Sequence, residues 1–368
     1  MKENTRRLID YSLPAVFENI LQTSVGFVDS VLIAKISLVA VSAVSLVNGV
    51  MAVYQAVFIA LAVAVATVVS NAAGARASKA VSENVRQSIA LSLMVGVILS
   101  ILSLVLAHPI LRAMGASGDI LQQGIIFFRV IAGTSVLIVL MTVLGQLIRT
   151  AGQTRTPLTI NLIVNILNFC LDFILIFGLF GFPRLGILGA GIGTALSRLI
   201  GVGLLFHKLQ QTSHRLQGPI FSRDQHIFKT EIVKRALPIM GERLMMRLGD
   251  IVIFVIIIAY GSKVFAGNAI GETITAYNYL PAFGFATGAS ILIARAYGAK
   301  DHLEIASLVL STGLLSSMKA LDGEIKSIET NMANRKYKPR VLIGLFDDNG
   351  ITEIEEDESD ETESEETA

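Results

Sequence analysis

Four polar side chains recur along an apolar stretch that ends near residue 180. Asn161, Asn165, Asn168 and Asp172 occupy positions 0, 4, 7 and 11 of this stretch. At about 100° per residue in an α-helix, all four lie on one face, within an arc of roughly 60°. In a membrane-spanning helix a carboxylate costs about 2.5 to 3.5 kcal/mol on insertion scales, so it normally faces a cavity or a partner. The pattern predicts a site that handles a cation or a proton, with interhelical hydrogen bonding as the alternative for the three asparagines.

A second polar face begins near the N-terminus. Glu18, Gln22, Gly26 and Asp29 occupy positions 0, 4, 8 and 11, which again fall on one side of a helix. Glu18 lies near the inner boundary of its span, where a structural role is the alternative to a functional one. Asp29 lies deeper, and we expect it to belong to the site.

Three polar residues of three different spans lie at similar depths. Counted from the predicted outer ends of the spans, Asp29 is about 5 residues in, Thr194 about 7 and Asp172 about 8, which at 1.5 Å per residue differ by only a few Å. We predict that these residues and Asn168 share one pocket. Two carboxylates in a medium of low dielectric cannot both ionise cheaply, so one of them should hold a proton or the pair should bind a cation.

The elements that position these residues are long apolar helices. Hydrophobic residues make up 53% of the 368 and charged residues only 16%, whereas an ordinary soluble domain is about a quarter charged. We expect an all-α integral membrane protein with eight spans and part of a ninth, because each apolar block is long enough to cross about 30 Å of hydrocarbon. The blocks cover residues 11–34, 39–70, 88–107, 124–148, 158–180, 187–207, 232–260 and 268–295, with the fragment at 303–316.

The charges predict which way the helices cross the membrane. Residues 347–368 hold 12 Asp or Glu and no basic residue, so the remaining chain carries 30 Lys and Arg against 17 acidic residues, a net charge of +13. Basic residues are concentrated at the N-terminus and in the even-numbered loops, while the odd-numbered loops have one each. The positive-inside rule therefore places the N-terminus and the even-numbered loops in the cytoplasm of a multi-pass cell-membrane protein. The immediate start of the first span predicts that this helix itself directs insertion.

The cysteine and the histidines point away from enzymatic chemistry. Cys170 is the only cysteine and lies within a span, so disulfides and cysteine-rich metal sites are excluded. The five histidines lie in or beside connections. Hydrolysis within the membrane would require a nucleophile with a base, or metal ligands, on facing helices. We therefore predict that the chain has no catalytic residues and is not an enzyme.

The sequence contains an internal repeat. Pro238 follows Pro14 by 224 residues; each opens a predicted apolar helix and precedes a glutamate by four positions, Glu18 or Glu242. The same offset relates Gly74-Ala75 to Gly298-Ala299. Six spans separate the copies, an even number, so both enter the membrane in the same direction. Such a parallel repeat is typical of secondary transporters.

The repeat is predicted to end near Ser317. The third span of the first copy, 88–107, corresponds to 312–331, where Lys319, Asp322, Glu324, Lys326 and Glu329 prevent a crossing. We predict an N-lobe at 1–210, an inter-lobe loop at 211–231, a partial C-lobe at 232–317, a segment of unrelated character at 318–346 and a disordered acidic tail at 347–368. The tail is either a cytoplasmic interaction segment with an unknown partner or sequence joined to a truncated transporter.

The seventh span carries its own charged group. Glu242, Arg243, Arg247 and Asp250 follow one another on it, and an Arg247–Asp250 pair is available at the i, i+3 spacing. These groups either satisfy one another within the bundle or contribute to function.

The chain resembles the MATE family, the multidrug and toxic compound extrusion transporters. The resemblance covers residues 1 to about 316 and rests on several motifs in order: "LPAVFENILQTSVGFVDSVLIAK", "GQLIRTAGQTRTPL", "NILNFCLDFILIFG", "GAGIGTALSR" and "ALPIMGERLMMRLGD". It implies a V-shaped bundle of two lobes that rock between inward-open and outward-open states. It also implies export of amphipathic, often cationic, drug-like small molecules across the lipid bilayer, with H⁺ or Na⁺ as the coupling ion, no other cofactor and no nucleic-acid partner.

The resemblance assigns roles to particular residues. The cation site of the family carries over onto Asp29, Asn168, Asp172 and Thr194, and its bending proline onto Pro14. Glu242 matches a C-lobe acid, but the helices that carry its partners have no counterpart here. The alternatives are therefore a transport-inactive truncated or fused fragment, a flippase of the same superfamily, or a membrane-anchored interaction protein whose acidic tail recruits a basic partner.

Overall fold

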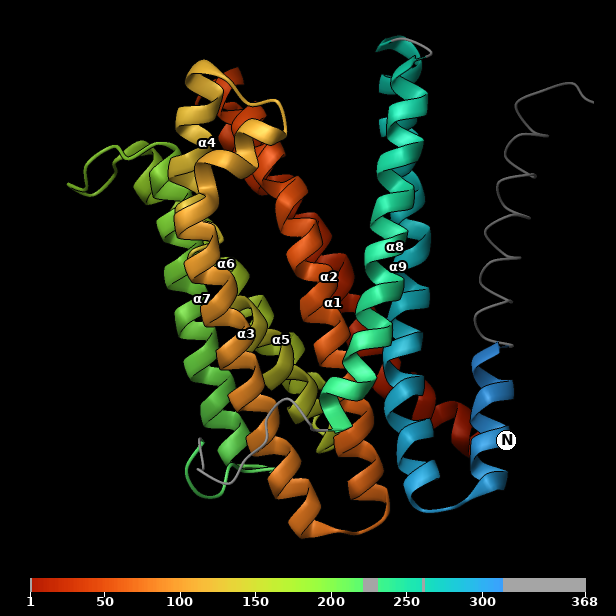
Figure 1. Cartoon of the computed structure of the whole chain (residues 1–368). Coiled ribbons are helices and arrows are strands. Elements are labelled where there is room, and N and C mark those ends of the chain that lie inside the picture. The colour runs from red at the N-terminus through yellow and green to blue at the C-terminus, as the bar shows by residue number, and fades with distance from the viewer. Residues whose placement is uncertain (1, 221–230, 260–261, 314–368) are drawn as a thin grey trace, which may run out of the picture. The chain divides into compact units, whose positions relative to one another are not determined.

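The computed structural model describes residues 2–220, 231–259 and 262–313, all of which lie within one compact unit of residues 1–320. The description leaves out some side chains of the first helix and of residues 251–259, and all side chains of residues 262–278. Within the described part every regular element is a helix (Figure 1), as the composition predicts. The helices are α1 (Lys2–Ala34), α2 (Leu38–Gly74), α3 (Ser78–Ala113), α4 (Gly118–Ile131), α5 (Ser135–Thr150), α6 (Arg155–Phe177), α7 (Ile187–Gln210), α8 (Glu231–Ala259) and α9 (Ser262–Gly298). Residues 302–313 are also helical.

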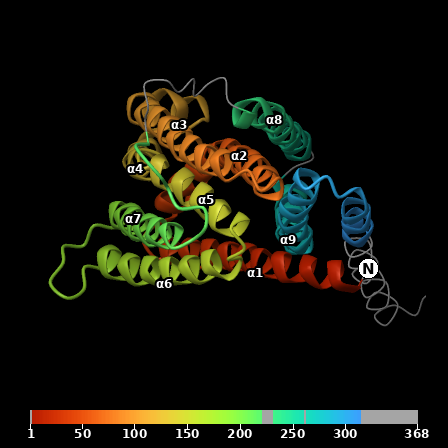
Figure 2. The same cartoon turned by 90° about the horizontal axis from the view of Figure 1, so that it is seen from below.

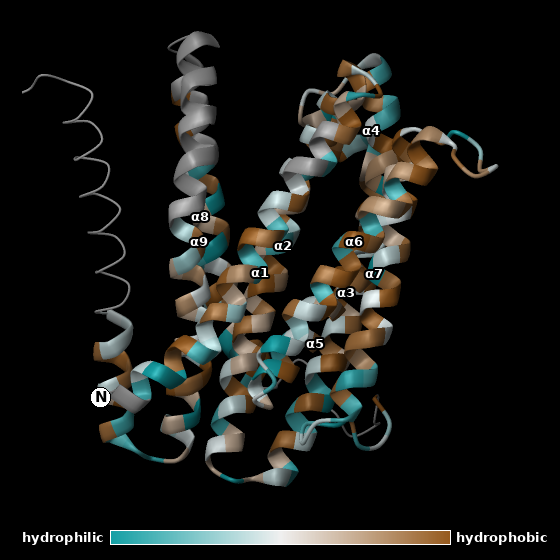
Figure 3. Cartoon of the chain, turned by 180° about the vertical axis from the view of Figure 1, so that it is seen from behind, coloured by the Kyte–Doolittle hydropathy of each residue, from teal (hydrophilic) through white to brown (hydrophobic). Residues whose placement is uncertain are grey.

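Several helices are long and apolar enough to cross a membrane. Among the described residues α2, α3, α6 and α7 meet this test, and α4 with α5 meets it as a bent pair. Hydrophobic residues cover much of these helices, and hydrophilic ones gather near their ends (Figure 3). The structure therefore supports the predicted spans from 39 to 207. α1, α8 and α9 have the required length, and their role as spans remains a prediction.

The predicted span over 124–148 is broken into two helices. α4 and α5 meet at a break and are bent by 43° relative to each other. At this break the hydroxyl of Thr134 donates to the carbonyls of Val130 and Ile131 at 2.8 and 3.1 Å. A β-carbon on Gly133 would collide with the carbonyl of Arg129. The side chain of Thr134 therefore satisfies backbone acceptors where the helical ladder is interrupted, as required inside a membrane.

Both repeat prolines lie inside their helices, and Pro14 lies further inside than the predicted start at residue 11 implies. α1 begins at Lys2 and passes through Pro14, and α8 begins at Glu231 and passes through Pro238. Each proline lacks an N–H and so removes one hydrogen bond. Membrane helices tolerate this loss because neighbouring groups can satisfy the freed carbonyl. The prolines therefore do not mark the helix starts.

Two apolar clusters hold the described helices together. The larger one combines buried residues of all helices from α1 to α7 and includes Ile232 of α8. The smaller one joins Leu8 and Val16 of α1 to Phe285 and Leu292 of α9, with Leu308 from the segment that follows. Seen from below, α1 runs between α6 and α9 (Figure 2). α1 therefore contacts both α6 of the first repeat and α9 of the second repeat.

The second repeat packs against the first through closely approaching backbones. A β-carbon on Gly74 would lie 2.8 Å from the carbonyl carbon of Arg295, and one on Gly298 would lie 2.8 Å from the carbonyl carbon of Asn71. Gly298 and Arg295 are the repeat equivalents of Gly74 and Asn71, so the two contacts are reciprocal. We call this reciprocal contact the glycine crossing. The hydrophobic effect does not drive helices together in a membrane, because lipid chains are as apolar as the side chains. Small residues promote such packing by letting the two backbones approach closely.

The equivalence extends to the residues that follow the two glycines. Arg76 and Lys300, also 224 residues apart, both adopt a positive φ, 54° and 59°. α1 contacts α9 while its repeat equivalent α8 contacts α2. The predicted parallel repeat is thus visible in the fold. The expectations for 318–346 and 347–368 fall outside the described residues, as do residues 221–230 of the predicted inter-lobe loop.

Candidate functional site

Three of the predicted site residues meet between α6 and α7. Asp172 and Asn168 of α6 are buried, at 2% and 6% exposure. The other side of this helix is largely apolar and exposed. The amide Nδ2 of Asn168 donates to the hydroxyl of Thr194 on α7 at 3.2 Å. Thr194 in turn donates to the carbonyl of Ala190 at 2.8 Å. The polar face of α6 therefore turns away from the apolar surroundings and toward α7.

Glycines of α7 make this approach possible. A β-carbon on Gly193 would collide with Oδ1 of Asp172 and would lie 3.1 Å from its backbone nitrogen. One turn earlier, a β-carbon on Gly189 would lie 2.7 Å from the carbonyl carbon and oxygen of Leu175. The glycine-rich sequence of α7 thus forms a packing surface against α6. At Gly193 it also makes room for the carboxylate.

The fourth predicted residue, Asp29 of α1, lies close enough to Asp172 for their charges to interact. Arg198 of α7 interacts electrostatically with both carboxylates. No ion pair within 4.0 Å links it to either one among the described residues. The structure thus brings Asp29, Asn168, Asp172 and Thr194 into one region and adds a cation that the sequence analysis missed. The spacing offered a signal, because Arg198 follows Thr194 by four residues and shares its helix face.

The oxygen atoms of this region suit a small cation. Oδ1 of Asp29 and Oδ1 of Asp172 are buried and accept no hydrogen bond from any described residue, and Nη1 of Arg198 is likewise buried without a partner. Buried polar atoms are normally satisfied, so unpaired carboxylate oxygens indicate a missing ligand or proton. Carboxylate, amide and hydroxyl oxygens are the donors that hard cations prefer. With both carboxylates ionised, the group of Asp29, Asp172 and Arg198 carries one net negative charge.

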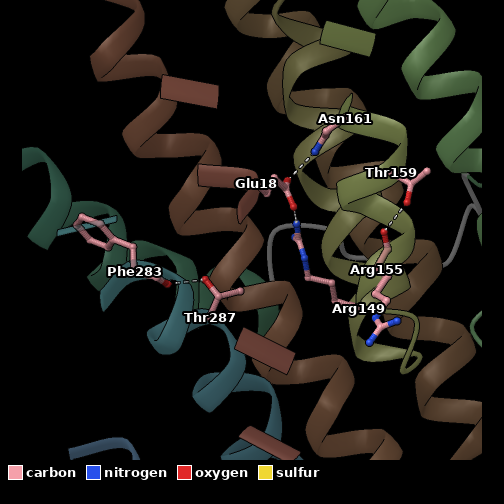
Figure 4. Close-up of polar contacts among 7 residues, drawn as sticks. All are labelled: Glu18, Arg149, Arg155, Thr159, Asn161, Phe283 and Thr287. Atoms are coloured by element: carbon pink, nitrogen blue, oxygen red, sulfur yellow. Dashed lines mark hydrogen bonds and ion pairs between the residues drawn. The ribbon is translucent and has the colours of Figure 1, made fainter. Parts of the chain in front are cut away.

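A second polar cluster lies nearer the N-terminal ends of α1 and α6 (Figure 4). Glu18 forms an ion pair with Nη2 of Arg149, from the end of α5, through Oε2. Its Oε1 accepts a hydrogen bond of 2.6 Å from Nδ2 of Asn161 on α6. The Glu18 and Arg149 side chains are only 18% and 8% exposed. We call these three residues the inner cluster, and in it the glutamate ties α1 to α5 and α6, consistent with the structural alternative given for Glu18.

The charged residues of α8 are arranged differently. Arg247 and Asp250 form the predicted i, i+3 pair, with Nη1 and Oδ2 at 3.2 Å and both side chains half exposed. Arg243 lies 6.0 Å from the ring centroid of Phe283 on α9. Glu242 is exposed and forms no hydrogen bond or ion pair with a described residue. The structure does not bring Glu242 into the cluster of Asp29 and Asp172.

The sequence matches the MatE family over residues 14–174 and 238–319, which together exceed half of the chain. The second match begins at Pro238, the repeat equivalent of Pro14. A probable multidrug resistance protein NorM of Thermotoga maritima is 32% identical over 308 residues, which cover 82% of this chain and 65% of the relative. The uncharacterized transporter YisQ of Bacillus subtilis is 28% identical over 198 residues, which cover 53% of this chain and 43% of the relative. The chain thus spans less than two thirds of the length of these relatives.

Solved structures show the same fold. A multidrug resistance MATE family transporter of the MOP superfamily in an outward-facing conformation superposes with a TM-score of 0.79 and 24% identity, covering 87% of this chain and 70% of the other. A MOP superfamily transporter from Pyrococcus furiosus gives the same values. The family match, the NorM relative and this fold agree with the repeat and with the membrane helices. The chain belongs to the MATE family of membrane transporters.

Proposed function

We propose that this polypeptide acts in cation-coupled export of amphipathic, often cationic, small molecules from the cell. The observation that carries the proposal is the pair of carboxylates on α1 and α6, each with an oxygen that lacks a hydrogen-bond donor among the described residues. Ionisable groups within membrane helices are costly and mark ion pathways. The multidrug resistance described for the relatives points to the same class of substrate.

The charge of the site supports coupling to one monovalent cation at a time. Arg198 interacts with both carboxylates and so offsets one of their two charges. A single H⁺ or Na⁺ bound to the remaining carboxylate would neutralise the group. Charge neutrality lowers the cost of moving α1 relative to α6 and α7 in a medium of low dielectric. Binding of the ion would thereby be linked to a change in helix packing.

We also propose that the N-terminus and the loops α2–α3, α5–α6 and α7–α8 face the cytoplasm of a plasma-membrane protein. The basic residues of these connections support this orientation. In this orientation the close contacts of Gly284 and Gly288 of α9 with Val16 and Ser12 of α1 lie in the cytoplasmic half of the membrane. The reason is that Ser12 and Val16 belong to the N-terminal half of α1.

Dye accumulation in an efflux-deficient bacterial host tests the transport proposal. Cells that produce the full chain should accumulate less of a cationic dye than cells with an empty vector, and Asp172→Asn should abolish this difference. Asp119→Asn is the matched control, since Asp119 lies exposed in the first turn of α4. Wild-type accumulation equal to that of empty cells, with the protein present in the membrane, would refute transport. Proteoliposomes with a proton gradient alone or a sodium gradient alone would then identify the coupling ion.

A further inference from the structure

A cavity of about 560 Å³ opens at the end of the bundle that is predicted to face the cytoplasm. Its walls come from the end of α2, the first turns of α3, the end of α5, the segment after α7 and the end of α9. Cavities of this size typically hold small molecules or their polar groups. The transport proposal does not use this cavity, whose residues are distinct from the cluster of Asp29 and Asp172.

Positive charge dominates the lining of this cavity, which we call the basic pocket. Five basic side chains line it, namely Arg76, Lys79, Arg86, Arg215 and Arg295, against a single acidic one, Glu83. Four of them, Arg76, Lys79, Arg215 and Arg295, take part in no ion pair within 4.0 Å among the residues that the structure describes. A concave surface lined by one sign of charge concentrates the field and attracts counter-ions.

The start of α3 adds to this field. α3 begins at Ser78, which lines the basic pocket, and no side chain caps this helix end. The first N–H groups of a helix have no partner within the helix and carry a partial positive charge. Helix N-termini combined with basic side chains are favourable places for phosphate groups.

The wall formed by the segment after α7 contains a buried histidine. His214 is 5% exposed, and its Nδ1 lies 3.1 Å from the hydroxyl of Thr150 and 3.3 Å from the carbonyl of Leu147. Burial lowers the pKa of His214, and the nearby Arg295 lowers it further. The imidazole therefore stays neutral at ordinary cellular pH and fixes the post-α7 segment to the end of α5 as a polar wall.

The basic pocket also joins the two repeats. Arg76 and Lys79 follow α2, whereas Arg295 belongs to α9, and its backbone packs against Gly74 in the glycine crossing. A neighbouring cavity shares Arg76 and Arg295 and is also lined by the ion pair of Arg7 with Glu304. An anion held between these residues would contact both repeats at once and would oppose their separation.

We propose that the basic pocket binds a phosphate group, carried either by the headgroup of an anionic phospholipid or by a small soluble phosphate compound. The location at the predicted membrane–cytoplasm boundary admits both sources, because anionic lipids of the inner leaflet attract basic groups at this level. Each basic side chain near such a surface contributes about 1 kcal/mol, which corresponds to roughly a fivefold change in affinity.

The test uses the purified full chain in a neutral detergent. Native mass spectrometry compares retention of phosphatidylglycerol with retention of phosphatidylcholine, and thermal melts with added inorganic phosphate measure the soluble source. We expect preferential binding of phosphatidylglycerol, or stabilisation by phosphate, and the responding arm identifies the source. Equal retention of the two lipids together with no effect of phosphate would overturn the proposal.

Three variants examine the basic pocket itself. Arg76→Gln combined with Arg295→Gln should weaken binding about 25-fold. Glu83→Gln should strengthen binding about fivefold, a gain that a misfolded protein would not show. Lys208→Gln is the matched control, because Lys208 is an exposed basic residue in the last turn of α7 that does not line the cavity. A loss in Lys208→Gln as large as in the double variant, or no change in the double variant, would show that the binding is unspecific and refute the proposal.

Discussion

The inner cluster makes a quantitative prediction about Glu18. Glu18→Gln keeps an oxygen that can accept from Asn161 but removes the negative charge next to Arg149. The guanidinium then stays in a site where it is only 8% exposed. Removing one partner of a buried ion pair typically costs 3–5 kcal/mol, and the lower end, about 3 kcal/mol, applies because Glu18 is itself partly exposed.

Far-UV circular dichroism melts of the detergent-solubilised protein measure this loss, and a double-mutant cycle tests its origin. Arg149→Gln should be destabilising as well, since it leaves the carboxylate without its cation. The double variant should be more stable than the sum of the two single losses predicts, because it contains no unpaired buried charge. Glu231→Gln is the control, as the Glu231–Lys234 pair is exposed on α8 and should not matter measurably. Strict additivity of Glu18→Gln and Arg149→Gln would refute the reasoning.

Three further predictions concern the packing of α2 and α7 and one histidine. Gly74→Ala should destabilise the protein by about 1–3 kcal/mol in thermal melts, because the new methyl group overlaps the backbone of α9; Gly241→Ala, with no neighbour within 4 Å, should not. Gly193→Ala should reduce dye export by displacing the adjacent carboxylate, whereas Gly203→Ala on the same helix, also without a neighbour within 4 Å, should leave export unchanged. Since burial lowers the pKa of His214, the unfolded chain binds its proton first as pH falls. Stability should therefore decrease as pH falls through about 6.5, the ordinary histidine value, and melts of His214→Gln should show a weaker dependence on pH.

The arrangement of the helices was largely predictable, and its exceptions have local causes. Apolar blocks and the repeat offset predicted most of the helices and the equivalence of α2 and α9. The bend between α4 and α5 was missed because hydropathy averages over many residues, while the break involves local contacts of Gly133 and Thr134. The start of α1 was placed too late, at residue 11 instead of Lys2, because the polar residues before the apolar block continue the helix.

The candidate site was predictable where it followed a single helix. The spacing of Asn168 and Asp172 on one face was sufficient to pair them with a neighbouring helix. Arg198 was missed because its spacing from Thr194 indicates only a shared helix face, while its relation to the two carboxylates depends on how α1, α6 and α7 pack. The same holds for Arg149, whose partner Glu18 lies 131 residues away.

The glycine crossing also has a consequence for how the chain is made. It joins Gly74 to a helix synthesised roughly 220 residues later, so this contact cannot form until nearly all the described helices have left the ribosome. Contacts between distant parts of a sequence form late and slow the approach to the native state. Until α9 arrives, the small-residue face of α2 must remain against lipid, which is tolerable because lipid chains solvate it as well as a helix would. Assembly of the two repeats is therefore a separate, final step that follows membrane insertion.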